Sequence, residues 1–156
     1  MRVLGLMRGV GRALVVVSMV LGGAMLSAGA ASADGPVHVR SRLGDACLDA
    51  PSWIGDVPVV INPCNDSDFQ RWNLNGQQLE NVAFPGKCLT PQEKSSVLHL
   101  EMCRGAMVQH WNFQPDGQVK NDVGNCLTAF GGPAPGTRVS GRWCNGDPGQ
   151  GWDSAP

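Results

Sequence analysis

One short motif, Gln-x-Trp, occurs three times in this 156-residue chain, and its spacing constrains the fold more than any other feature. The copies lie at residues 70–72, 109–111 and 150–152, so their tryptophans are 39 and 41 residues apart. A fixed period of this length indicates one supersecondary unit copied several times, each copy unable to bury its apolar face alone. The residues concerned, which we expect in the core, are Gln70, Trp72, Gln109, Trp111, Gln150 and Trp152.

The six cysteines follow the same period. The first cysteine of each repeat opens a C-L-[D/T] sequence, and the second precedes a Gln-x-Trp. An even number of cysteines in an exported chain indicates disulfides. The period selects one pairing among the many that six cysteines allow, and each bridge contributes about 3 kcal/mol. The expected bridges are Cys47–Cys64, Cys88–Cys103 and Cys126–Cys144.

The first 33 residues have the pattern of a secretory signal peptide. Residues 1–12 carry three arginines and no acid, residues 13–26 are an apolar run, and Ala31-Ser32-Ala33 supplies small residues for cleavage. An uncleaved membrane anchor is the weaker alternative, because the run is shorter than the roughly 20 residues that a bilayer span needs. We therefore expect one secreted, extracellular domain at residues 34–156, with no membrane association after cleavage.

Composition argues against several function classes. Residues 34–156 hold 9 basic and 13 acidic side chains without a Lys/Arg cluster, which disfavours nucleic acid as a partner. The thiols are needed for bridges, the three histidines match no zinc spacing, and C-x-x-C and G-x-S-x-G are absent. A carboxylate pair for glycoside hydrolysis can be judged only from a fold. We expect no enzymatic activity, no metal and no cofactor.

Local patterns indicate short strands and many turns. A β-prone run precedes each second cysteine, and residues 73–82 and 112–122 look like hairpins, with Asn75-Gly76 and Asp116-Gly117 at their turns. On a strand, the Gln and Trp of Gln-x-Trp face the same side, so we expect both to point inward. Three copies of about four strands leave exposed edges unless they close into a barrel. The fold class is therefore all-β.

C-L-[D/T], a second cysteine after a short β run, and Q-x-W, repeated three times, resemble the ricin B-type lectin family from about Val37 to Trp152. The resemblance is nearest to small stand-alone secreted actinobacterial lectins. It implies a β-trefoil of six hairpins, with repeats at about 37–73, 74–112 and 113–153. It also implies sugar binding in shallow pockets, with galactose-type or other glycans on cell surfaces or glycoconjugates as partners.

The resemblance places the family's sugar ligands at four positions of each repeat. These are the Asp of C-L-D, an aromatic residue two before the second cysteine, a polar residue two before that, and the Asn just before Q-x-W. In the three repeats they hold Asp49, Asn62, Val60 and Phe69; Thr90, Glu101, His99 and Val108; and Thr128, Arg142, Ser140 and Gly149. No repeat keeps the full set. A carboxylate accepts strong charge-assisted bonds from sugar hydroxyls, so we expect weak or atypical binding centred on repeat one.

The candidate carbohydrate-binding residues of repeat one are Asp49, Trp53, Asn62 and Asn65. Two of them have alternatives that the sequence leaves open. Asp49 binds a sugar or caps a turn, and Trp53 stacks on a ligand or packs under its loop.

Repeats two and three offer weaker candidates. His99 and Glu101 form either a polar pocket or a solvated pair, and Arg142 recognises an acidic group or has no specific role. Trp143, next to Cys144, is expected in the core or against the disulfide. The rival function is a trefoil scaffold that has lost sugar binding and acts as a secreted protein–protein interaction module or effector.

Overall fold

The computed structural model describes residues 35–156, so the predicted signal peptide at residues 1–33 lies outside the described residues. Twelve strands and three 3₁₀ helices follow one another in three groups. The first group is β1 (Val37–Ser41), β2 (Ala46–Asp49), β3 (Val60–Pro63), η1 (Asp68–Gln70) and β4 (Arg71–Asn75). The second is β5 (Gln78–Asn81), β6 (Lys87–Pro91), β7 (Leu98–Met102), η2 (Met107–Gln109) and β8 (Trp111–Phe113). The third is β9 (Val119–Asn121), β10 (Asn125–Ala129), β11 (Thr137–Trp143), η3 (Pro148–Gln150) and β12 (Trp152–Ala155).

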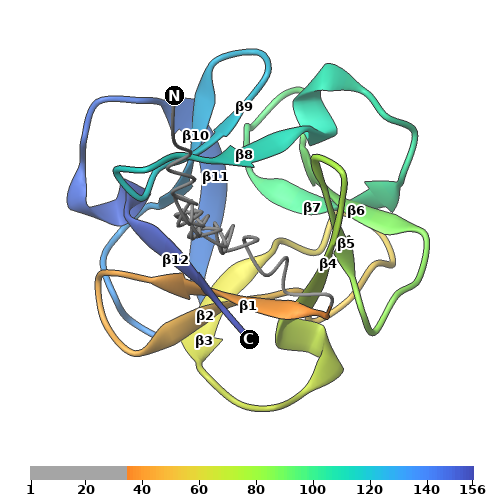
Figure 1. The fold of residues 1–156 in the computed structure, drawn as a ribbon, viewed down its shortest axis with the longest axis horizontal. Coiled ribbons are helices and arrows are strands. Elements are labelled where there is room, and N and C mark those ends of the chain that lie inside the picture. The colour runs from red at the N-terminus through yellow and green to blue at the C-terminus, as the bar shows by residue number, and fades with distance from the viewer. Residues whose placement is uncertain (1–34) are drawn as a thin grey trace, which may run out of the picture. The chain divides into compact units, whose positions relative to one another are not determined.

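Every group is paired in the same way. Its first strand pairs with its second and its second with its third. Its fourth strand pairs with the first strand of the next group, and β12 closes the ring on β1. Figure 1 shows the groups as three sectors around a common centre, orange to yellow-green, green to teal, and blue. This arrangement of six antiparallel hairpins confirms the predicted β-trefoil.

The core lies where the three groups meet. Each group contributes a Gln-x-Trp tryptophan, the leucine of its C-L-x sequence and an aliphatic residue of its first strand, all buried. Burying one large apolar side chain stabilises a fold by about 1.5–3 kcal/mol, so these equivalent triplets form the main packing contribution. The residues are Trp72, Trp111 and Trp152; Leu48, Leu89 and Leu127; and Val39, Leu79 and Val119.

The two hairpin predictions are confirmed, with one difference in detail. Strands β4 and β5 form a hairpin in which Asn75 pairs with Gln78, and β8 and β9 form the second. Only the glycine of each predicted turn has a positive φ, 60° at Gly76 and 91° at Gly117. Asn75 is instead the last residue of strand β4. Glycine takes the positive-φ position of the turn because it has no Cβ and adopts this conformation without a steric cost.

The placement of Gln-x-Trp wholly on a strand is wrong. The glutamine is the last residue of a 3₁₀ helix in all three groups. Its Oε1 accepts a backbone N–H from five residues earlier, at 2.8, 3.0 and 3.0 Å, and this bond turns the chain before the following strand begins. The donors are Asn65, Arg104 and Asn145.

Three disulfides join the second strand of each group to the segment after its third strand. They are Cys47–Cys64, Cys88–Cys103 and Cys126–Cys144, with Cα–Cα distances of 4.9, 5.0 and 5.0 Å. This is the pairing that the period predicts.

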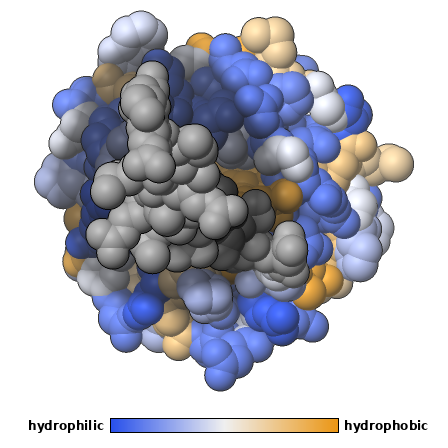
Figure 2. Space-filling model, in the orientation of Figure 1, coloured by the Kyte–Doolittle hydropathy of each residue, from blue (hydrophilic) through white to orange (hydrophobic). Residues whose placement is uncertain are grey.

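The visible surface of the described part is mixed in character. Figure 2 shows mostly hydrophilic residues on this face, with hydrophobic ones scattered among them. Single exposed apolar side chains are ordinary on a protein surface. Within residues 35–156, no helix is long and apolar enough to cross a membrane.

Candidate functional site

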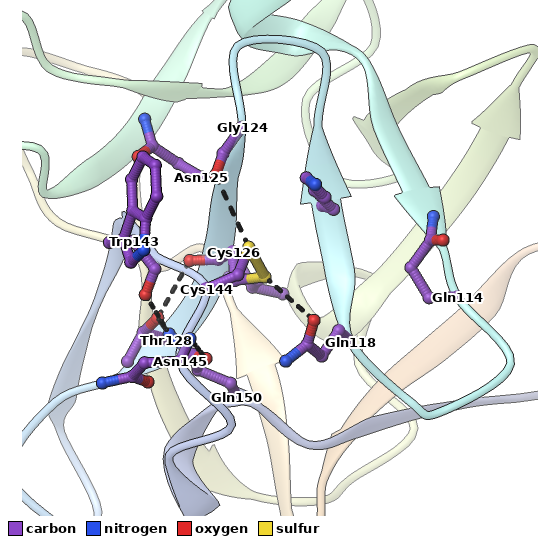
Figure 3. Close-up of a disulfide and its surroundings, with 12 residues drawn as sticks. Gln114, Gln118, Gly124, Asn125, Cys126, Thr128, Trp143, Cys144, Asn145 and Gln150 are labelled. Atoms are coloured by element: carbon purple, nitrogen blue, oxygen red, sulfur yellow. Dashed lines mark hydrogen bonds between the residues drawn. A yellow bond between two sulfur atoms is a disulfide. The ribbon is translucent and has the colours of Figure 1, made fainter.

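A shared polar network lies beneath the surface of each repeat. The Nε2 of the Gln-x-Trp glutamine donates to the C-L-x residue: Gln70 to Asp49 at 2.9 Å, Gln109 to Thr90 at 2.9 Å, and Gln150 to Thr128 at 3.2 Å. The same nitrogen donates to the carbonyl oxygen just before the second cysteine. Figure 3 shows this arrangement in repeat three. Each glutamine therefore fixes the side chain that stands at the family's Asp position.

Asp49 is held by side chains rather than by a turn. It is only 8% exposed, and its Oδ2 accepts from Nε2 of Gln70 and, at 3.1 Å, from Nδ2 of Asn62. Its Oδ1 has no hydrogen-bond partner within residues 35–156, and it is not among the buried unpaired atoms. No described backbone N–H donates to the Asp49 carboxylate, so the turn-cap alternative does not hold. The carboxylate is pre-oriented, with one oxygen left accessible.

The other family positions of repeat one are already engaged. The Asn62 amide donates to Asp49, and its oxygen accepts the backbone N–H of Gly136 at 3.0 Å. Phe69 packs its ring against Phe84, with the ring centroids 5.7 Å apart. The position that carries an aromatic residue in the family is thus an immobilised amide, and the Asn position is apolar.

The side chains of Trp53 and Asn65 contact other residues and not the Asp49 carboxylate. Trp53 is 44% exposed, and Nζ of Lys87 lies 4.1 Å from its ring centroid, so it is not packed under its loop. Asn65 lines a different cavity of about 270 Å³ beside the Cys47–Cys64 disulfide. Among the described residues, no hydrogen bond joins either side chain to Asp49. The structure brings together only Asp49 and Asn62 of the four candidates.

In repeat two, charged side chains surround the equivalent position. Glu101 contacts Nε2 of His99 at 2.9 Å and also pairs with Arg104. A cavity of about 280 Å³ is lined by Thr90, Glu101, Arg104 and seven other residues, including Val108. His99 is only 6% exposed, so the two candidates are not a solvated pair. The carboxylate of Glu101 is neutralised by Arg104 rather than left open for a ligand.

Repeat three has a pocket with a different composition. A cavity of about 170 Å³ is lined by Thr128, Phe130, Arg142, Trp143, Asn145, Asp147 and Gln150. The guanidinium carbon of Arg142 lies 3.7 Å from the centroid of the Phe130 ring. Arg142 at the family's aromatic position is therefore itself stacked on an aromatic ring.

Trp143 is expected in the core or against the disulfide, and the core alternative is wrong. Its side chain is 79% exposed and lines the repeat-three cavity. In the strand pair it stands opposite Asn125, as Figure 3 shows, while its carbonyl oxygen accepts from Gln150. The backbone of Trp143 takes part in the inner network, whereas its ring projects outward.

Sequence reasoning also missed two other residues of this pocket. Phe130 begins the glycine- and proline-rich segment "FGGPAPG", and an aromatic residue in such a segment was the only available signal. Asp147 caps η3 by accepting the backbone N–H of Gly149 at 2.8 Å. A Cβ on Gly149 would overlap the carbonyl oxygen of Ala129, so the family's Asn has no room here.

The comparisons with known proteins agree with this architecture. The family model described as "Ricin-type beta-trefoil lectin domain" matches residues 35–152. The chain belongs to the ricin-type beta-trefoil lectin family. An uncharacterized protein of Mycobacterium tuberculosis is 56% identical to this lectin-family chain, over 98% of each chain.

Solved structures at lower identity share the fold. The agglutinin from Abrus precatorius has a TM-score of 0.67 and 21% identity over 77% of this chain, which spans 48% of the agglutinin chain. The C-half of an earthworm R-type lectin, solved in complex with GalNAc, has a TM-score of 0.65 and 11% identity. That match covers 77% of this chain and 97% of the earthworm one.

Proposed function

We propose that this protein is a secreted, non-catalytic lectin that binds glycans weakly through repeat one, with Asp49 as the central ligand. The observation that supports it best is the Asp49 carboxylate, whose Oδ2 is fixed by two amides while Oδ1 stays accessible. A fixed carboxylate oxygen accepts hydrogen bonds from sugar hydroxyls without the cost of ordering a mobile side chain. Galactose-type glycans on cell surfaces or glycoconjugates are the proposed partners.

Weak binding follows from the neighbours of Asp49. Strong sugar sites combine a hydrogen-bonding group with an open aromatic face, and here the aromatic position holds Asn62. Both ends of the Asn62 amide already have partners. The proposed site therefore offers one strong acceptor and few additional contacts.

Secretion is supported by the three disulfides of the described residues, because such bridges persist in oxidising compartments outside the cytosol. The absence of catalysis rests on the family relationship. Glycans then meet a binding surface rather than a reaction centre.

The engaged amide of Asn62 and the paired ring of Phe69 favour one competing function. These contacts are also what a trefoil that has abandoned sugars would show, with its loops serving a protein partner. The two functions differ in whether glycan binding depends on the Asp49 carboxylate.

The chain itself supplies a matched test, the substitution Asp49→Thr. Repeats two and three carry Thr90 and Thr128 at this position, and their hydroxyls accept from the glutamine amide as Asp49 does. The threonine therefore removes the carboxylate while keeping a partner for Gln70. We expect an unchanged circular dichroism spectrum and a loss of neutral-glycan binding of about tenfold or more on a glycan array at high protein density.

Asp56→Thr is the control, since it removes an exposed carboxylate from the same repeat. Asp56→Thr binding equal to that of the wild type, together with the loss in Asp49→Thr, supports the proposal. Absent glycan binding by the wild type, or unchanged binding by a folded Asp49→Thr, would overturn it and favour the protein-binding function.

A further inference from the structure

Repeat three combines features that point to a second ligand class. All four family positions have changed there, yet the cavity carries two exposed aromatic rings, Phe130 at 60% and Trp143 at 79% exposure. Pockets for drug-sized ligands enclose about 300–1,000 Å³. A cavity of about 170 Å³ is therefore suited to a single sugar unit.

The cation of this pocket is positioned but unpaired. Arg142 is exposed, and within residues 35–156 it has no ion pair or side-chain hydrogen bond. The Phe130 ring lies 3.7 Å from the guanidinium carbon and positions this cation, and the guanidinium N–H groups have no partner within residues 35–156. A planar fork of this kind matches the two oxygens of a carboxylate or a sulfate.

The same pocket also contains one anion. Oδ1 of Asp147 accepts a hydrogen bond from the backbone N–H of Gly149, while Oδ2 has no partner among the described residues. Among the described residues that line the cavity, Arg142 and Asp147 alone are charged. A pocket with one cation and one anion suits a ligand that has both an acidic group and hydroxyls.

We propose that repeat three binds an anionic sugar, with Arg142 taking the acidic group, Asp147 accepting from hydroxyls, and Phe130 and Trp143 providing apolar faces. The inference rests on the proposed lectin function but concerns a different pocket. The carboxylate lost at Thr128 is replaced by Asp147, and the ring lost at Arg142 by Phe130. Sialic acids, uronic acids and sulfated sugars share the required chemistry.

The net negative charge of residues 34–156 disfavours nonspecific binding of anions. Residues 34–156 hold more acidic than basic side chains, so the protein as a whole repels polyanions. The positions equivalent to Arg142 in the other two repeats carry no cation, because Asn62 there bonds Asp49 and Glu101 pairs with Arg104. A preference for acidic glycans must therefore come from the pocket rather than from general attraction.

The test uses pairs of immobilised glycans that differ only in a terminal sialic acid, uronic acid or sulfate. We expect the wild type to bind at least one acidic member about tenfold more tightly than its neutral partner, as one charge-assisted hydrogen bond implies. Arg142→Gln should reduce that ratio to about one, and Arg142→Lys should give an intermediate ratio because lysine lacks the planar fork. The acidic member that shows the preference identifies the natural class.

Lys120→Gln is the matched control, because it removes one exposed positive charge from repeat three without touching the cavity. The inference is overturned if the wild type shows no acidic preference, or if Lys120→Gln and Arg142→Gln reduce it equally. Asp49→Thr separates the two proposals: it should lower neutral-glycan binding about tenfold or more and leave the binding of the acidic glycan to repeat three unchanged. If Asp49→Thr loses neutral-glycan binding but the wild type shows no acidic preference, the proposed function of repeat one is supported and the anionic site in repeat three is contradicted.

Discussion

The inner network and the outer rim of each repeat have diverged to very different extents. In all three repeats a buried glutamine bonds the C-L-x side chain, and a buried tryptophan donates its Nε1 hydrogen to the carbonyl oxygen of the C-L-x leucine, at 3.1, 3.0 and 2.8 Å. The rim positions just above this network share no residue among the three copies. Asn62, Glu101 and Arg142 occupy one such position, and Phe69, Val108 and Gly149 another.

The difference follows from what each part must satisfy. A buried amide or indole N–H without a partner costs about 1–3 kcal/mol, so the inner residues cannot change independently of one another. A rim side chain can take its hydrogen bonds from water, and its replacement costs little stability. The trefoil therefore keeps its network in triplicate, while the three rims carry a hydrogen-bonded amide at Asn62, a paired charge cluster at Glu101 and an arginine stacked on Phe130.

The difference between the inner network and the rim can be tested by replacing one tryptophan of each part with alanine. Trp72→Ala removes a buried indole, with its hydrogen bond to the Leu48 carbonyl, and we expect it to lower the free energy of unfolding by about 3–5 kcal/mol. Trp143→Ala should change it by no more than about 0.5 kcal/mol, because the ring is exposed. Urea titrations followed by circular dichroism measure both. Similar losses for the two variants would contradict the assignment of Trp143 to the rim.

The sequence predicted the inner part of the molecule well because the inner part is periodic. Three concordant markers at one spacing predicted three all-β repeats and the pairing of Cys47–Cys64, Cys88–Cys103 and Cys126–Cys144, and the family resemblance implied the trefoil. Even there, periodicity could not show that each glutamine ends a 3₁₀ helix. That detail depends on the bond from its Oε1 to a backbone N–H, which no pattern of apolar residues reports.

The rims could not be predicted in the same way. The position of Trp143 next to Cys144 predicts a place in the core or against the disulfide, but the register of β11 sets its side chain opposite Asn125 on the surface. Phe130 and Asp147 join Arg142 only through the folding of two loops that are separate in the sequence. Their partnership depends on tertiary distance, and a single sequence carries no signal of it.

A second prediction concerns the family's Asn position, where backbone geometry separates repeat three from repeat two. Gly149→Asn should cost about 1–3 kcal/mol of unfolding free energy, because a Cβ would overlap the carbonyl oxygen of Ala129. Val108→Asn, the equivalent change in repeat two, should cost at most about 1 kcal/mol at its half-buried site. Chemical denaturation of both variants provides the measurement. Equal costs would show that close backbone packing is not why repeat three lost its Asn.

The smallest expected effect concerns the ion pair between Arg42 and Asp153, which lies outside the family's sugar-binding positions in all three repeats. It links the first hairpin of the trefoil to the last strand. Arg42, in the turn after β1, bonds Asp153 of β12 at 2.6 Å and the carbonyl oxygen of Asp116 at 2.9 Å. The hydrogen bond from Arg42 holds the pKa of the Asp153 carboxyl below its ordinary value of 3.8 and raises the pKa of Arg42. A lowered folded-state pKa means that the pair contributes stability above pH 3.8, and that the contribution disappears as the pH falls through the folded pKa.

Asp153→Asn should therefore lower Tm slightly at neutral pH and low salt, and the difference from the wild type should vanish in strong acid or near 1 M salt, where screening is almost complete. Asp45→Asn is the matched control, because Asp45 pairs with Arg40 only five residues away and links no distant segments. Both pairs are exposed, so Coulomb attraction alone gives them similar small effects. Only the Arg42 pair joins the first hairpin to the last strand. A larger Tm change in Asp153→Asn than in Asp45→Asn would measure the stability that the Arg42–Asp153 pair adds to the pairing of β12 with β1. Equal changes would show that this strand pairing alone holds the first hairpin and the last strand together.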